Sequence, residues 1–144
     1  MWVKGIPLHF VVDNDNQKNL ISTEVINRLE LSTTPHPQSY NLGWLSQGQG
    51  IRITQQCLLT YGIKPFKDEV LCNVAPLEVY DVLLGQPYMW KSHAVYESWN
   101  CSVIVTLEGK LYQILEIIAP DTVSQGRKIS SHIIKLFLFT IVYE

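Results

Sequence analysis

The sequence has no excess of basic residues and no basic run. Lysine and arginine together number 11, against 13 aspartates and glutamates, so the formal net charge is -2. Proteins that grip the phosphates of nucleic acid usually show a basic excess or a clustered basic patch. The sequence therefore predicts no direct nucleic-acid partner.

Closely spaced cysteines and histidines, which hold structural metals, are also missing. The three cysteines, Cys57, Cys72 and Cys101, stand far apart, and no two of the four histidines have the spacing of metal ligands. A structural zinc site needs such ligands in short-range pairs. We expect no metal, no cofactor, and free thiols in a reducing compartment.

Long hydrophobic runs are absent as well. The most apolar stretch, residues 133–142, is short and contains Lys135, whereas a helix that spans a bilayer needs about 20 apolar residues. The N-terminal residues contain no apolar stretch of signal-peptide length. We therefore expect an intracellular, cytoplasmic protein with no signal peptide, no transmembrane helix and no membrane partner.

Frequent glycines and prolines divide the 144 residues into short segments rich in β-forming side chains. This length suits one domain with its own core, and a hydrophobic content of 47% argues against a disordered chain. Closely spaced turns between many short strands predict an all-β barrel or sandwich. The expected strands cover residues 8–12, 40–45, 51–55, 57–61, 68–75, 81–85, 94–97, 102–107 and 110–115. A tight turn at Glu108 and Gly109 joins the last two.

One helix and one helical turn interrupt this pattern. Ser22 is a good N-cap for a helix over residues 23–31, and Pro35 and Pro37 prevent the helix from continuing. Pro87 favours the start of a helical turn over residues 86–90.

A glycine-rich turn at residues 46–50 separates the strand at 40–45 from a segment that alternates with period two. Such a pattern predicts a hairpin with a flexible tip.

The composition changes after Glu116. Residues 120–128 are polar and typical of a linker, and residues 130–144 are strongly apolar. We therefore divide the chain into a domain at 1–116 and a linker with an apolar tail at 117–144. The tail is either an added strand or an exposed end that is prone to aggregation.

Asp13 is the first candidate for chemistry. It follows the apolar segment 8–12 and precedes the polar, turn-rich segment 14–19. A carboxylate at a strand end, where the chain turns sharply, can be presented into a cleft. The alternative is an ordinary solvated turn aspartate, and the local sequence taken alone favours this alternative.

The order of motifs along residues 3–115 resembles the retropepsin-like aspartic proteases, in particular the protease segment of plant Ty3/gypsy-type LTR retrotransposon polyproteins. The family's aspartate motif maps onto Asp13, Asn14 and Asp15, followed by Asn19-Leu20-Ile21-Ser22. Its second motif maps onto Leu83-Leu84-Gly85-Gln86-Pro87-Tyr88, followed by Trp90. Residues 67–72 are also similar to that subgroup. The resemblance implies a single-lobe acid-protease fold, a closed barrel with one or two short helices.

The resemblance also implies a role for each motif. Asp13 would pair with Asp13 of a second copy, so that a homodimer forms the catalytic dyad. Two carboxylates about 3 Å apart share one proton, and the pair activates water against a peptide bond. Leu83, Leu84 and Gly85 would support the catalytic loop. The hairpin tip would close over a peptide or polyprotein substrate as a flap, through Ser46, Gln47, Gly48, Gln49 and Gly50.

Two positions of the catalytic loop depart from the family. Asn14 stands where a serine or threonine is usual, and Asp15 replaces the glycine of the motif. A side chain at a glycine position risks a clash or backbone strain of about 1–3 kcal/mol. In a dimer, two extra carboxylates would also crowd the dyad. We therefore expect weak or absent activity, with any residual activity at acidic pH.

Three hypotheses follow. The first is an impaired retrotransposon-derived aspartic endopeptidase that cleaves polyprotein peptide bonds. The second is an inactive domain of the same fold that acts in dimerisation or peptide binding. The third is an unrelated all-β module in which Asp13 is only a turn residue.

Overall fold

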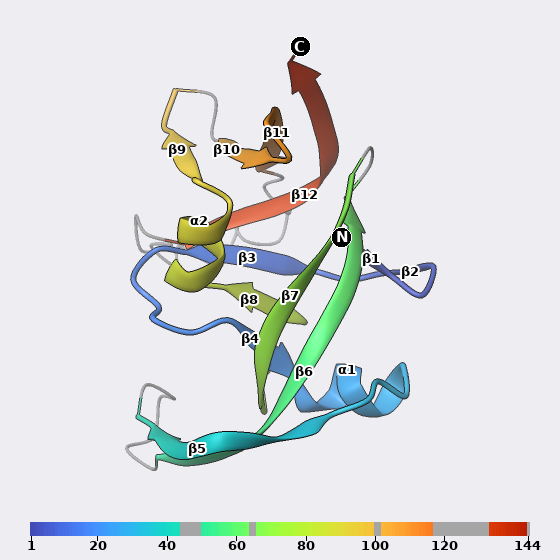
Figure 1. The fold of residues 1–144 in the computed structure, drawn as a ribbon, viewed down its shortest axis with the longest axis vertical. Coiled ribbons are helices and arrows are strands. Elements are labelled where there is room, and N and C mark those ends of the chain that lie inside the picture. The colour runs from blue at the N-terminus through green and yellow to red at the C-terminus, as the bar shows by residue number, and fades with distance from the viewer. Residues whose placement is uncertain (44–49, 64–65, 100–101, 117–132, 144) are drawn as a thin grey trace, which may run out of the picture.

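The computed structural model describes residues 1–43, 50–63, 66–99, 102–116 and 133–143. Within them the chain is mostly β, with one curled sheet and two short helices (Figure 1), so the all-β prediction is confirmed. The strands are β1 (Trp2–Val3), β2 (Ile6–Pro7), β3 (Phe10–Asp13), β4 (Leu20–Ser22), β5 (Thr34–Leu42), β6 (Ile51–Ile63), β7 (Phe66–Ala75), β8 (Val82–Leu84), β9 (Val95–Glu97), β10 (Ser102–Leu107), β11 (Lys110–Glu116) and β12 (Ile133–Tyr143), and the helices are α1 (Thr23–Arg28) and α2 (Gln86–Lys91).

Strands β3, β8 and β4 form the centre of the sheet. β8 runs parallel to β3, with Val12 opposite Leu84, and antiparallel to β4, with Leu20 opposite Leu83. β8 therefore separates two strands that are consecutive in the chain. Because β3 and β8 are parallel, the residues that follow each of them emerge at the same end of the sheet.

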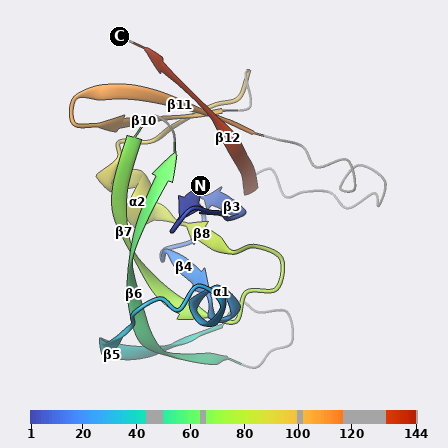
Figure 2. The same cartoon turned by 90° about the vertical axis from the view of Figure 1, so that its right-hand side faces the viewer.

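β6 forms antiparallel hairpins with both β5 and β7. Figure 2 shows that β6 and β7 curve away from the centre of the sheet. β5 pairs with β6 up to Leu42 opposite Ile51, which confirms the predicted hairpin. Its tip at residues 44–49, with four of the five predicted flap residues, lies outside the described residues. β5 begins at Thr34 and includes Pro35 and Pro37, because it pairs with β6 alone among the described strands and an edge strand tolerates proline.

Helix α1 begins at the predicted residue, Thr23, and ends before the predicted residue 31. The Ser22 hydroxyl accepts a hydrogen bond from the Glu24 backbone amide at 3.2 Å, which confirms the N-cap. The helix ends at Arg28 rather than at residue 31, since Glu30 has a φ of 50°, outside the helical region. α2 begins at Gln86 with Pro87 in its first turn, as predicted.

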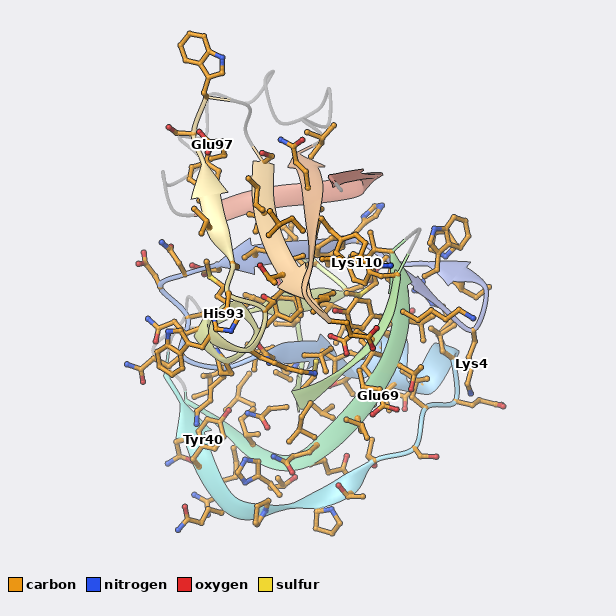
Figure 3. The ribbon with its side chains drawn as sticks, turned by 45° about the horizontal axis from the view of Figure 1, so that its top comes forward. Lys4, Tyr40, Glu69, His93, Glu97 and Lys110 are labelled. Atoms are coloured by element: carbon orange, nitrogen blue, oxygen red, sulfur yellow. The ribbon has the colours of Figure 1, made fainter. Side chains whose placement is uncertain are left out.

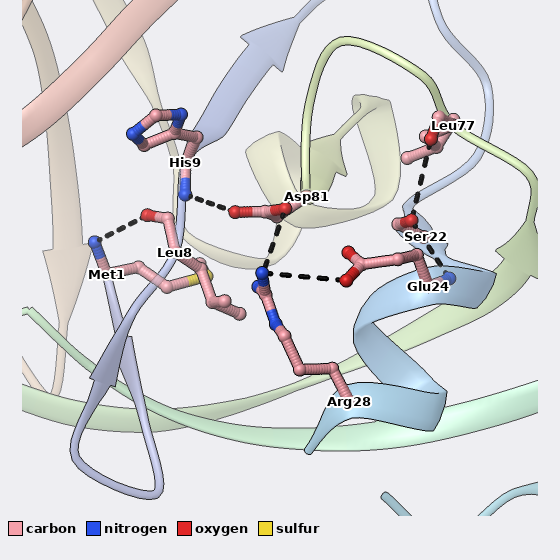
Figure 4. A network of polar contacts seen from close by, with 8 residues as sticks. All are labelled: Met1, Leu8, His9, Ser22, Glu24, Arg28, Leu77 and Asp81. Atoms are coloured by element: carbon pink, nitrogen blue, oxygen red, sulfur yellow. Dashed lines mark hydrogen bonds and ion pairs between the residues drawn. The ribbon is translucent and has the colours of Figure 1, made fainter. Parts of the chain in front are cut away.

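Polar contacts join α1 to the segment before β8 (Figure 4). Asp81 accepts the His9 backbone N–H at 2.8 Å and lies 3.9 Å from the Arg28 guanidinium, which also approaches Glu24. The Ser22 backbone N–H donates to the Asp81 carbonyl oxygen at 2.8 Å. Exposed ion pairs contribute little, so the backbone bonds are what fix β8 beside β4.

Of the two alternatives for the apolar tail, an added strand or an exposed end, the structure shows the added strand, β12. β12 lies between β3 and β11, with Ile133 opposite Asp13 and Tyr143 opposite Leu111 (Figure 1). It joins β9, β10 and β11 to the rest of the sheet through backbone pairing. The described residues include no helix long and apolar enough to cross a membrane.

Two tyrosines in the core make the fold sensitive to high pH. Tyr61 donates a hydrogen bond to the Tyr88 hydroxyl at 3.4 Å, and both side chains are almost fully buried. Burial, with a smaller effect from Asp68, raises the pKa of Tyr88 to about 12, and burial also raises the pKa of Tyr61. Both groups are therefore held in the neutral form.

We expect stability to fall above pH 10. The phenols of the unfolded chain lose their protons near pH 10, before those of the folded chain, so the unfolded state is favoured as pH rises towards 12. Tyr88 alone predicts a loss of about 1 kcal/mol between pH 9 and pH 11. Urea titrations across this range measure it, and the Tyr61→Phe/Tyr88→Phe variant should show a flatter profile. An equal slope in both proteins would contradict this assignment.

Candidate functional site

Asp13 is the last residue of β3, at the point where a buried strand opens into a turn. Phe10, Val11 and Val12 are buried, and Asp13 is half-buried. Its carboxylate accepts the Asp15 backbone N–H at 3.0 Å, and its carbonyl oxygen accepts the Asn16 N–H at 3.2 Å. These bonds hold the carboxylate at the mouth of the turn instead of leaving it on a loose loop.

The end of β8 lies against this turn. The Gly85 N–H donates to Asn19 Oδ1 at 2.9 Å, and the Gln86 N–H donates to the Asn16 carbonyl oxygen at 2.8 Å. The Gln86 side chain also donates to the Asn14 carbonyl oxygen at 3.0 Å. The loop between β3 and β4 is therefore fastened to the β8–α2 junction at three points.

Gly85 is required by this close approach. A Cβ at this position would lie 2.5 Å from the Asn16 carbonyl oxygen and nearer still to that of Lys18. Both atoms belong to the backbone, so neither can turn aside as a flexible side chain would. This steric constraint is sufficient to explain a glycine at position 85, whether or not the site is catalytic.

Leu83 and Leu84, which are neighbours on β8, belong to two separate hydrophobic clusters. Leu84 belongs to the main core, and Leu83 packs with Leu20, Leu42 and Ile53 in a second cluster. Neighbouring residues of a strand face opposite sides of its sheet. Leu83 therefore packs in the same cluster as Leu42, at the end of the hairpin strand β5.

A cleft of about 440 Å³ opens beside Asp13. One wall is the loop with Asp13, Asp15, Asn16, Gln17 and Lys18, and the other is the end of β5, with Tyr40, Asn41 and Leu42. Of the predicted flap residues, only Gly50 is described; it is exposed, just before β6. The predicted catalytic aspartate and one strand of the predicted flap hairpin thus share one cleft.

The backbone strain predicted for Asp15 is absent. Among the described non-glycine residues, positive φ angles occur only at Lys4, Glu30, His93 and Glu108. Asn14 and Asp15 therefore follow Asp13 without a positive φ, and their side chains are exposed. Strain from a left-handed backbone at Asp15 is absent, whereas a clash or charge repulsion between the two loops of a dimer stays a prediction.

Sequence reasoning missed Tyr80, which precedes β8. It is half-buried, and burial raises the pKa of its phenol, with the charge of Asp13 raising the pKa further. The phenol is therefore held in its protonated form within electrostatic range of Asp13. No local pattern signals this, because the two residues are brought together only when β8 pairs with β3.

Lys18 and Tyr40 are the other residues that the sequence did not single out. The Lys18 ammonium lies 4.9 Å from the centre of the Tyr40 ring, within the range of a cation–π contact. Asn73 on β7 donates to the Tyr40 hydroxyl at 2.7 Å. Tyr40 projects from β5 (Figure 3), so this contact joins the Asp13 loop to the hairpin.

In the described part of the chain, no group of three or more histidine, cysteine, aspartate or glutamate residues is arranged to hold a metal. No protein-family model matches this chain, and none of the curated proteins matches it.

Proposed function

We propose that this chain is a retropepsin-like aspartic endopeptidase domain of the kind found in plant Ty3/gypsy-type LTR retrotransposon polyproteins. One observation carries the proposal: Asp13 ends a buried strand and opens on a cleft whose other wall is the glycine-tipped hairpin strand. The fastening of Gly85 and Gln86 to the Asp13 loop supports it, since a catalytic carboxylate needs a rigid mounting.

The reaction requires two copies of the chain. Each copy contributes one Asp13, and the two carboxylates share one proton because they cannot both ionise at close range. The ionised member takes a proton from water while the water oxygen attacks the scissile carbonyl carbon. The protonated member donates its proton to the carbonyl oxygen. Collapse of this intermediate breaks the C–N bond and returns the proton to the leaving amine.

Asp15 impairs this arrangement by its charge. It lines the same cleft as Asp13, so a dimer would gather four carboxylates in a small volume. Like charges at short range raise the free energy of the ionised pair and oppose association of the two copies. This observation also supports the second candidate function, an inactive domain of the same fold that binds peptides or dimerises.

Removal of the Asp15 charge tests the proposal. We expect Asp15→Gly to raise hydrolysis of an unstructured polypeptide by at least about tenfold at neutral pH, because one pKa unit of repulsion corresponds to a factor of ten. Rates are compared between pH 3 and pH 7, and the unchanged chain should be most active at the acidic end.

The control is Asp13→Ala in the Asp15→Gly background, which should abolish hydrolysis. If the unchanged chain, the Asp15→Gly variant and the double variant are all folded and dimeric but hydrolyse nothing, the endopeptidase is excluded. The peptide-binding domain is then favoured. If all three proteins are folded monomers that neither hydrolyse nor bind the polypeptide, both candidate functions fail and the unrelated all-β module is left.

A further inference from the structure

A second cleft, of about 400 Å³, adjoins the Asp13 cleft. Lys18 lines both, so its side chain stands at their junction. The second cleft continues past Asn19 and His36 to the outer faces of β6 and β7 and to the start of α2. The two clefts together provide a path that leads away from Asp13 on one side.

The second cleft presents unusual apolar surface. Leu58 and Leu71 lie directly opposite each other on β6 and β7, with 59% and 49% of their surface exposed. Pro87 of α2 lines the same cleft. Two adjacent exposed leucines beside a hollow are suited to contact with aliphatic side chains of a partner.

Lys18 is the cation in this path that has no carboxylate partner in the described part of the chain. Lys91, at the far end, lies 3.5 Å from Asp68 and donates to the Glu69 carbonyl oxygen at 2.8 Å. Lys18 is instead held by the Tyr40 ring, and the hydroxyl of that ring is bonded to the buried Asn73. A positioned ammonium between two clefts favours an anionic group of whatever binds there.

We propose that Lys18 is a specificity-determining residue that binds an acidic side chain of the peptide substrate. An aliphatic residue of the same peptide, two positions farther from the scissile bond, lies over Leu58 and Leu71, since alternate residues of an extended chain face the same side. Asp13 and Asp15 repel an acidic side chain placed nearer to the cleavage point. This inference rests on the proposed function and names its substrate class: aliphatic peptides with an acidic residue at this position on either side of the cut, because each copy of the dimer contributes one Lys18.

Peptide binding tests the inference separately from hydrolysis. The protein carries Asp13→Asn to prevent cleavage, and binding of labelled, unstructured aliphatic dodecapeptides is followed by fluorescence anisotropy at pH 7 and low salt. One set of peptides moves a single glutamate along the chain and a second set moves a single lysine. We expect at least one position where glutamate binds about threefold to fivefold more tightly than lysine, as for an exposed ion pair.

Lys18→Glu should reverse the preference at that position. The matched control is Lys67→Glu, which makes the same charge change at an exposed residue of β7 that lines neither cleft. Leu71→Ser should weaken all peptides with an aliphatic residue two positions away. The inference is overturned if no peptide binds, if no position discriminates, or if Lys67→Glu acts as Lys18→Glu does.

The two proposals fail in different ways. If the Asp15→Gly variant hydrolyses no polypeptide, the endopeptidase proposal is excluded. Peptide binding at Lys18 is then decided by the anisotropy measurement alone. Hydrolysis by Asp15→Gly with no preference for glutamate removes only the role of Lys18.

Discussion

Replacement of Gly85 with alanine is expected to destabilise the fold by about 3 kcal/mol or more, at the upper end of the range for overpacking. The added Cβ would lie 2.5 Å from the Asn16 carbonyl oxygen and closer to that of Lys18. Relief requires the Asp13 loop to move away from β8, which breaks the bond from the Gly85 N–H to Asn19. Urea unfolding measures the loss of stability.

Gly62→Ala is the matched control. Gly62 lies on β6, and a Cβ there would meet its nearest neighbours at 3.8 Å, an ordinary contact distance. Its stability should be unchanged or slightly higher, because alanine narrows the unfolded ensemble. Equal unfolding midpoints for the two variants would show that the loop and β8 are not in close contact.

A chain that ends at Glu116 is expected to lose several kcal/mol of stability, given about 1 kcal/mol for each backbone hydrogen bond. Without β12, β3 loses one of its two neighbours and β11 loses its pairing with the strand that links it to β3. The freed edge of β3 belongs to a strand with three buried apolar residues, so aggregation should follow. Urea unfolding and size-exclusion chromatography check both effects.

Two point variants separate backbone pairing from side-chain charge in β12. Lys135→Pro places a residue without an N–H in the part of β12 that pairs with β3, where Lys135 lies opposite Val11, and it should act in the same direction as the truncation. Lys135→Thr removes the charge, introduces a β-forming residue and keeps the backbone N–H, so it should not act as the truncation does. A truncated chain that remains soluble with an unchanged midpoint would contradict the role given to β12.

The hairpins and the helix starts could be predicted because their signals are local. Ser22 caps α1 through its own side chain, and Pro87 suits the first turn of α2. The turn at Glu108 and Gly109 has positive φ at both residues, which a tight hairpin between β10 and β11 requires. Such features depend on residues a few positions apart, so sequence carries them.

The end of α1 and the start of β5 were less predictable. The helix was expected to reach residue 31, but Glu30 leaves the helical region as the chain turns towards β5. Pro35 and Pro37 look unfavourable for a strand until β5 is seen at the edge of its sheet. In both cases the position of a distant partner decided the outcome.

By itself, the sequence determined the β-rich class, the capped helix, the hairpins and Asp13 as the candidate at a strand end. These follow from side-chain volume, alternation and turn chemistry within short segments. Tertiary structure alone decided that Gly85 meets the Asp13 loop, that Lys18 stands over Tyr40, that Tyr80 approaches Asp13, and that β12 pairs with β3. Such contacts join residues far apart in the chain, and the pairing of distant strands in one sheet, which no local pattern encodes, creates them.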